Sequence, residues 1–260
     1  MKYLNLIKHV ANWQDYLGIK LGFNKDKPVI LKLGEIPLKL KLIPSMKPLF
    51  NEIFLKDVYG PALKSVKTET PTIIDIGGNM GFFAMYSFLN KPKAKIYSFE
   101  PVPTNFSFLN NHKKEHSFLN WELYNVAVSD KSGEFDFYYN HNYSPEGVDV
   151  SASLFSSDKI STVENSHNKI TVPVVSFLHW MKENNIKGCD ILKLDCEGAE
   201  YNIAYSIPDE LFKNIKYIVA DVHPMTGKNE NIQALSSFLK TKGYKVDVVN
   251  EELLYAQYAS

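Results

Sequence analysis

Arginine is absent from this chain of 260 residues, so its strong cations are all lysines. A phosphate-rich ligand could not be held here by the two-pronged guanidinium group, only by lysine, backbone amides or helix N-termini. Lysine and arginine together number 29, which equals the number of aspartates and glutamates, so the formal net charge is zero. No overall positive field attracts nucleic acid or an anionic membrane. The composition therefore argues against a nucleic-acid partner and weakly against phosphate-dense substrates.

Cysteine is scarce, and no long apolar run occurs. Cys189 and Cys196 are the only cysteines, without C-x-x-C spacing or a nearby histidine cluster. A structural zinc site therefore has no support, and we expect reduced core residues. The N-terminus lacks an unbroken apolar segment with a cleavage signal, and no stretch reaches about 18 apolar residues. These absences predict a cytoplasmic protein with no membrane span.

Residues 1–70 differ in pattern from the rest and predict an N-terminal extension. An amphipathic stretch from Tyr3 to Leu21 is expected to be helical, with one apolar face formed by Leu4, Ile7, Val10 and Leu17. This face offers a contact for a homodimer. Two alternating segments around residues 34–37 predict a hairpin, and residues 49–66 predict a helix broken at Gly60 and Pro61.

From residue 71 the chain alternates strand and helix, which predicts a single domain over 71–260. Expected strands cover 72–77, 94–100, 121–128, 190–197 and 216–223, and expected helices cover 80–90, 103–116, 176–185 and 229–242. A hairpin from YKVDVV and LLYAQYA ends the chain, and residues 129–174 are predicted to insert a β element and a loop. This order predicts an α/β fold with a Rossmann-like, doubly wound, mainly parallel seven-stranded sheet.

The first strand ends in a glycine-rich loop, DIGGNMG (75–81). Such a loop lets a ligand approach the main chain before a helix N-terminus. The dinucleotide pattern G-x-G-x-x-G is not met, because Asn79 and Phe82 occupy two glycine positions. Glu100 ends the second strand nineteen residues after Gly81, where a carboxylate can accept both hydroxyls of a ribose. The pattern favours a ribose-bearing ligand without a bridging pyrophosphate.

The fourth strand places three charged side chains on one face, Lys193, Asp195 and Glu197. One interpretation is structural, with Lys193 paired to Asp195 because a buried lysine needs compensation. The other is functional, with Asp195 or Glu197 meeting the substrate at the carboxyl end of the strand. The two are compatible, since Lys193 can keep Asp195 ionised while Glu197 faces the cleft.

The fifth strand ends with Asp221 and His223 on one side. His223 is the candidate general base because histidine titrates near neutral pH, although a hydrogen-bonded edge histidine is an equal alternative. A divalent cation held by Asp195, Glu197, Asp221 and His223 is a third alternative, but no metal is expected. Asp221 is also a candidate substrate contact, together with Tyr143 and Ser153 of the insertion. The alternative for the insertion is an ordinary solvated loop.

Four segments together resemble the FkbM family of methyltransferases: IDIGGNMGFF, SFEPVPTNF, NVAVSD and LKLDCEGAEY. The resemblance covers roughly residues 70–225 and implies S-adenosylmethionine as cofactor. It implies a methionine site at the glycine loop, a ribose site at Glu100 and an adenine edge over 125–130. The implied cofactor residues are Asp75, Gly77, Gly78, Asn79, Gly81, Glu100, Pro101, Asn125 and Ala127.

The family is associated with O-methylation of natural products and carbohydrates. The resemblance therefore implies an O-methyltransferase acting on a hydroxyl of a small or sugar-like molecule, with nucleotide-linked sugars and surface polysaccharide precursors among the candidates. Two alternatives stay open: an NAD-dependent sugar-modifying oxidoreductase and a non-catalytic module that binds S-adenosylmethionine. A nucleic-acid base methyltransferase would need an Asn/Asp-Pro-Pro-aromatic ending on strand four, where residues 195–198 read DCEG.

Overall fold

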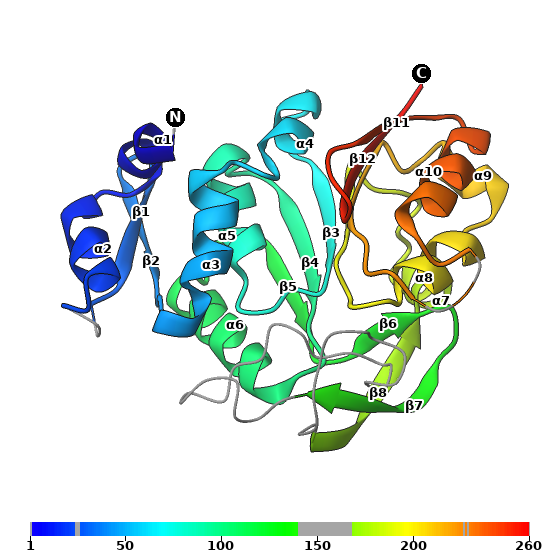
Figure 1. Cartoon of the computed structure of the whole chain (residues 1–260), viewed down its shortest axis with the longest axis horizontal. Helices are drawn as coiled ribbons and strands as arrows, with labels where there is room; N and C mark the ends of the chain where they lie inside the picture. The colour runs from blue at the N-terminus through cyan, green and yellow to red at the C-terminus, as the bar shows by residue number, and fades with distance from the viewer. Residues whose placement is uncertain (1, 24–26, 140–167, 226, 228, 260) are drawn as a thin grey trace.

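The structure, a computed structural model, describes residues 2–23, 27–139, 168–225, 227 and 229–259 (Figure 1). A seven-stranded sheet forms its centre, in the order β11-β12-β10-β9-β3-β4-β5. Its strands are β3 (Thr72–Ile76), β4 (Lys95–Phe99), β5 (Trp121–Tyr124), β9 (Ile191–Leu194), β10 (Tyr217–Asp221), β11 (Tyr244–Val248) and β12 (Leu253–Tyr258). The first five are parallel, and β12 runs antiparallel to both β10 and β11. The predicted Rossmann-like sheet with a terminal antiparallel hairpin is confirmed.

Helices cover both faces of the sheet because neighbouring strand residues point to opposite sides. Ile73 belongs to one buried apolar cluster together with α5 (Phe82–Asn90) and α6 (Pro103–Glu115), whereas Ile74 belongs to the other. The second cluster is completed by α7 (Phe177–Glu183), α8 (Glu200–Ser206), α9 (Asp209–Phe212) and α10 (Ile232–Thr241). No helix within the described part of the chain combines the length and the apolar content needed to cross a membrane.

The chain order places a switch point at β3. From β3 the chain continues to β4 and β5 on one side, and later to β9 and β10 on the other. Loops after β3 and β4 therefore diverge from those after β9 and β10, and a crevice opens beyond the carboxyl ends of these strands. The sequence predicts ligand binding at this edge.

The segment predicted as one strand over 121–128 is two strands in two different sheets, so that prediction is wrong. β5 ends at Tyr124, and β6 (Ala127–Ser129) pairs with β8 (Asn168–Ser176) in a separate three-stranded sheet. Asn125 turns the chain between them, because its side-chain amide donates to the carbonyl oxygens of Glu100 at 2.8 Å and Pro101 at 3.2 Å.

The predicted β element of the insertion is confirmed. β7 (Gly133–Tyr139) pairs antiparallel with β8 and completes the small sheet, which lies beside the carboxyl edge of the main sheet (Figure 1). Tyr143 and Ser153, predicted as substrate contacts, lie outside the described residues.

The predicted N-terminal hairpin is confirmed as β1 (Val29–Leu33) and β2 (Ile36–Leu40), but the single amphipathic helix is wrong. Two helices form, α1 (Lys2–His9) and α2 (Trp13–Lys20), because the chain between them pairs with β1. Val10 bridges Leu31, and the side-chain oxygen of Asn12 accepts the backbone amide of Ile30 at 2.7 Å. Leu4 and Ile7 are exposed, whereas Val10, predicted on the same face, is buried.

The predicted break at Gly60 and Pro61 is wrong, because both residues belong to a helix, and the predicted helix over 49–66 instead forms three short pieces. They are α3 (Lys47–Phe50), a π-helical turn over Asn51–Leu55, and α4 (Gly60–Ser65). Pro61 lies at the start of α4, where a residue without an amide hydrogen is tolerated. The extension is continuous with the main core, since Phe54 of the turn packs edge-on against Phe82 of α5 at 6.3 Å.

Two buried histidines, His112 of α6 and His116 directly after it, tie the extension to the domain. The Nε2 atom of His112 accepts the backbone amide of Lys41 at 3.0 Å, and Nε2 of His116 accepts that of Lys39 at 2.9 Å. The Nδ1 atom of His112 lies 2.9 Å from the carbonyl oxygen of Met80, so the neutral tautomer protonated on Nδ1 satisfies both partners. Burial lowers the pKa of His112 to about 4.

We expect the stability of the fold to fall as the pH drops from 6.5 towards 4. Over this window His112 takes up a proton in the unfolded state but not in the folded state. This difference lowers the free energy of unfolding by on the order of 3 kcal/mol. Urea unfolding at pH 7 and pH 4.5 would measure the loss for the wild type and for His112→Gln, whose smaller loss isolates this side chain. His179→Gln, at an exposed position, is the control. Equal pH dependence in wild type and His112→Gln would contradict the assignment.

Candidate functional site

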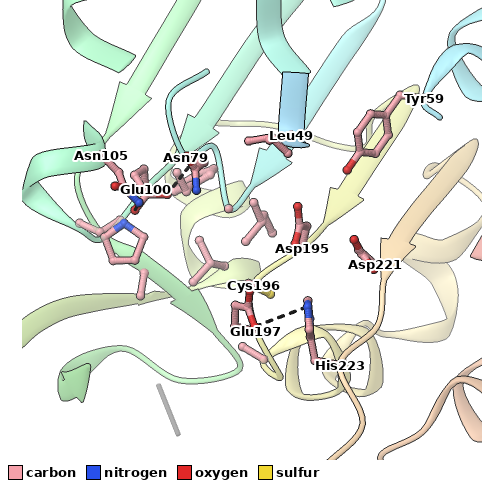
Figure 2. A pocket seen from close by; sticks show the side chains of 18 of the residues that line it. Leu49, Tyr59, Asn79, Glu100, Asn105, Asp195, Cys196, Glu197, Asp221 and His223 are labelled. Carbon is pink, nitrogen blue, oxygen red and sulfur yellow. Dashed lines mark hydrogen bonds and ion pairs between the residues drawn. The ribbon is translucent and has the colours of Figure 1, made fainter. Parts of the chain in front are cut away.

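A pocket opens at the carboxyl edge of the sheet, with about 930 Å³ of empty space including its open mouth. The ends of β3, β4, β9 and β10 form its floor, and the extension contributes one wall (Figure 2). The predicted site residues that line it are Gly77, Asn79, Glu100, Pro101, Ala127, Asp195, Glu197, Asp221 and His223. The structure thus brings together side chains from four separate strand ends.

Gly77 presses the glycine loop against the end of β9. Its φ is +82°, and a Cβ atom there would lie 1.7 Å from the carbonyl oxygen of Asp195. No side chain fits that position, so main chain alone forms this part of the pocket. The amide of Gly77 donates to the carbonyl oxygen of Phe99 at 3.1 Å, which also fixes the loop to β4.

The other two glycines of the loop support it without lining the pocket. The amide of Gly78 donates to the carbonyl oxygen of Phe99 at 2.8 Å. Gly81 has a φ of +85°, and a Cβ atom there would lie 2.7 Å from the ring of Trp121. Both glycines therefore set the path of the loop towards α5. Asn125 also lies outside the lining, where it holds the carbonyl oxygens of Glu100 and Pro101.

Asp75 lies beneath the pocket in a buried charged cluster. Asp75, Ser98 and Lys193 are register partners on adjacent strands, so their side chains share one face. Asp75 accepts the hydroxyl of Ser98 at 2.8 Å and pairs with Lys193 at 3.3 Å. Burial raises the pKa of Asp75. The geometry gives this carboxylate a supporting position behind the glycine loop.

Lys193 pairs with Asp195 at 3.2 Å, as the sequence predicts, and with Asp75 as an unforeseen second partner. Its ammonium also donates to the carbonyl oxygen of Gly77 at 2.8 Å. Burial alone opposes the positive charge, but Asp195 and Asp75 outweigh it and raise the pKa of Lys193. The lysine therefore stays charged and locks the glycine loop to β9.

Glu100 is a buried carboxylate at the wall of the pocket, with 4% of its surface exposed. One oxygen accepts the amide of Asn79 at 2.8 Å, and the other accepts the amide of Val102 at 2.9 Å and the side-chain amide of Asn105 at 3.4 Å. Burial raises its pKa to about 7. Carboxylate oxygens have spare lone pairs after such bonds, so Glu100 can still accept ligand hydroxyls.

An apolar wall adjoins Glu100. It is formed by Phe99, Pro101 and the segment 126–128 that begins β6. Pocket walls of this kind accept flat rings.

His223 lies between two carboxylates. Its Nδ1 atom is 3.2 Å from Glu200, and its Nε2 atom is 3.5 Å from Glu197 (Figure 2). Burial works against a charged ring, but the hydrogen bond and the charge of Glu200, followed by the charge of Glu197, raise the pKa of His223 well above its usual value. A histidine that already carries its proton at neutral pH is poorly placed to accept another. The geometry favours the alternative of a hydrogen-bonded histidine.

Glu200 is the residue of this cluster that sequence reasoning undervalued. Its two oxygens accept the amides of Cys196 and Gly198, each at 2.8 Å, in addition to the contact with His223. Glu200 lies in the first turn of α8, a helix outside the ranges expected from the sequence, and its side chain returns to the loop before that helix. Glu200 therefore holds the loop that carries Glu197.

Glu197 adopts an unusual backbone conformation within the pocket lining. Its φ is +54°, a left-handed value that costs energy for a residue with a side chain. Burial raises its pKa to about 8, despite the opposing charge of His223. Strained residues of this kind cluster at functional sites, and the side chain points into the pocket (Figure 2).

Sequence reasoning missed the wall that the extension supplies. Leu49, Glu52 and Tyr59 line the pocket opposite the ends of β9 and β10. No motif marks them, and only the fold shows that they reach this edge. Across the residues that the structure describes, no group of three or more His, Cys, Asp or Glu side chains is arranged to hold a metal ion.

Comparisons with known proteins cover the part of the chain that supplies the strand ends of this pocket. The family model described as "Methyltransferase FkbM domain" matches residues 75–246, which include the glycine loop and all four strand ends. The 31-O-demethyl-FK506 methyltransferase FkbM of Streptomyces tacrolimicus is 24% identical over 237 residues, covering 80% of this chain and 85% of that protein. The 2-O-methyltransferase NoeI of Sinorhizobium fredii is 27% identical over 150 residues, covering 56% and 61%. The crystal structure of methyltransferase FkbM from Methylobacillus flagellatus has a TM-score of 0.49 and 11% identity, covering 75% and 45%.

Proposed function

Because the chain belongs to the FkbM methyltransferase family, we propose that it transfers a methyl group from S-adenosylmethionine to a hydroxyl oxygen of a small molecule or carbohydrate. The observation that carries the proposal is Glu100, a buried carboxylate at the end of the second parallel strand that opens onto the pocket. A carboxylate at this position is suited to accept both hydroxyls of a ribose.

The residues of the pocket fit this cofactor. Gly77 and Asn79 offer main chain to a methionine tail, Glu100 offers its oxygens to the ribose, and the apolar wall by Ala127 offers a surface for adenine. Asp75 lies beneath the pocket and pairs with Lys193, whose ammonium donates to the carbonyl oxygen of Gly77 in the glycine loop. The sulfonium of the cofactor supplies an electrophilic methyl group. The chain's own task is to orient the acceptor oxygen and exclude water.

Glu197 is the candidate general base. It lines the pocket, and burial raises its pKa to about 8, close to the range in which a base works best. In its ionised form, one carboxylate oxygen would take the proton from the acceptor hydroxyl as the new carbon–oxygen bond forms and the methyl carbon–sulfur bond breaks, with S-adenosylhomocysteine as the leaving group. His223 holds Glu197 in place as a charged partner, and Asp195 and Asp221 are candidates to orient the acceptor.

Two relatives support oxygen as the methylated atom, since their names specify a 31-O-demethyl substrate and 2-O-methylation. Neither name fixes the acceptor of this chain. Sugar-like acceptors remain the first group to test, with nucleotide-linked sugars and surface polysaccharide precursors among them.

Calorimetry with S-adenosylhomocysteine and with NAD tests the proposal directly. We expect S-adenosylhomocysteine to bind with a micromolar Kd and NAD to bind at least about a hundredfold more weakly, because the glycine loop departs from the dinucleotide pattern. Transfer of a labelled methyl group to a panel of hydroxyl-bearing acceptors then tests catalysis. Preferential binding of NAD would overturn the proposal in favour of an oxidoreductase. Cofactor binding without transfer to any acceptor would favour a non-catalytic module.

A further inference from the structure

Two side chains of the extension face the strand ends across the pocket. Glu52 lies in the π-helical turn and Tyr59 directly precedes α4, and both line the pocket together with Asp195 and Asp221. The hydroxyl of Tyr59 points towards Asp195 and Asp221 (Figure 2). Tyr59 is only 2% exposed, yet its hydroxyl makes no hydrogen bond to any residue that the structure describes. An unpartnered hydroxyl on a buried side chain, open to a cavity, indicates a ligand.

The two residues are rigidly placed. The ring of Tyr59 packs edge-on against Phe83 of α5 at 4.8 Å. The carbonyl oxygen of the preceding residue, Val58, accepts the hydroxyl of Tyr255 from β12. The amide of Val58 also donates to the carbonyl oxygen of Glu52 at 3.5 Å. The segment from Glu52 to Tyr59 is therefore anchored to the domain that forms the rest of the pocket.

This side of the pocket has an excess of negative charge. Of the nearby cations, Lys193 pairs with Asp75 and Asp195 below the floor, and His223 lies between two other carboxylates. Lys56 lowers the pKa of Glu52 by its charge but does not outweigh burial. Glu52 and Asp221 form no salt bridge within the described part of the chain. Burial, followed by the charge of Asp195, raises the pKa of Asp221 to about 7, and burial also raises the pKa of Glu52. Such a pair of carboxylates disfavours an anion and favours a cation.

We propose that Glu52, Tyr59 and Asp221 form a subsite for a protonated amine, a role that rests on the methyl transfer proposed above. The carboxylates compensate its charge, and the oxygen of Tyr59 accepts one of its hydrogens. A phosphate or carboxylate would be repelled, and a neutral hydroxyl would leave the excess negative charge in place. The amine has two sources at this site: the α-ammonium of the cofactor's methionine, or an amino group of the acceptor.

Glu52→Gln and Tyr59→Phe test the subsite, because each keeps the shape of the side chain and removes a charge or an oxygen. Calorimetry would compare S-adenosylhomocysteine with 5′-methylthioadenosine, which lacks the amino-acid tail. A second titration would compare glucosamine with glucose on protein saturated with S-adenosylhomocysteine. Glu35→Gln, at an exposed position of the same extension, is the control, and thermal melting verifies folding.

If the variants bind S-adenosylhomocysteine about tenfold more weakly but bind 5′-methylthioadenosine as the wild type does, the methionine ammonium is the bound amine. If the variants bind glucosamine about tenfold more weakly but bind both adenosine compounds as the wild type does, the bound amine is an amino group of the acceptor. Variants that match the wild type with every probe would overturn the subsite while leaving the proposed function intact. A wild type that binds neither adenosine compound would instead overturn the proposed function itself.

Discussion

Replacing Glu100 with alanine weakens the binding of S-adenosylhomocysteine by at least about a hundredfold. The proposed ribose loses two hydrogen bonds to a charged acceptor, each contributing roughly 1.5–3 kcal/mol, and about 1.4 kcal/mol corresponds to a factor of ten in Kd. Isothermal calorimetry measures the change. Glu122→Gln is the control, because Glu122 lies on neighbouring β5 but is half-exposed in a surface pair with Lys95.

The pH dependence of binding separates this role from a purely structural one. Burial raises the pKa of Glu100 to about 7, so below that pH the free protein holds a proton that ligand hydroxyls must displace. Affinity should therefore fall by about tenfold per pH unit as the pH drops below 7, and rise to a plateau above it. Glu100→Gln should remove this dependence while Glu122→Gln keeps it. A Kd for Glu100→Ala within about threefold of the wild type would refute the ribose assignment.

The parts of the fold that the sequence predicted correctly are those that local pattern determines. The run TIIDI is strongly β-branched and ends at glycines, so β3 and the loop after it follow from residues 72–81 alone. Parallel strands share one carboxyl edge, and that rule brings Glu100, Glu197 and His223 to one pocket without knowledge of any contact.

The errors come from side chains whose partners are distant in sequence. Asn125 ends β5 because it bonds to the carbonyl oxygens of the loop after β4, and nothing in the segment NVAV indicates that turn. Val10 divides the first helix because it meets Leu31. Tyr59 reaches the pocket only because the extension packs on α5. Periodicity carries no information about such long-range contacts.

The assignment of the base was underdetermined for a related reason. The sequence places His223 and Glu197 at adjacent strand ends, and histidine is the usual choice near neutral pH. The structure adds Glu200, which returns from α8 to hold both the ring and the loop. With a carboxylate at each nitrogen, the pKa of His223 lies well above its usual value, and Glu197 is the pocket-lining group that can accept a proton once the pH passes its own pKa of about 8.

Glu197→Gln is accordingly expected to lower kcat by about 10³-fold, within the range of 10²–10⁴ found when a general base is removed. The Kd for S-adenosylhomocysteine should change by less than about threefold, because the side chain acts on the acceptor. Initial rates of labelled methyl transfer to an acceptor from the panel measure the first quantity, and calorimetry measures the second. Glu210→Gln, at an exposed residue of α9, is the control.

His223→Gln distinguishes the two candidate bases. The charge of His223 lowers the pKa of Glu197, which burial raises to about 8. In the wild type kcat should rise with pH through about 8, as Glu197 ionises. Without the cation that midpoint should move to higher pH while the plateau activity survives, because the carboxylate that accepts the proton is still present. If His223→Gln abolishes turnover at every pH while Glu197→Gln keeps more than about a tenth of it, the histidine is the base and the assignment to Glu197 is wrong.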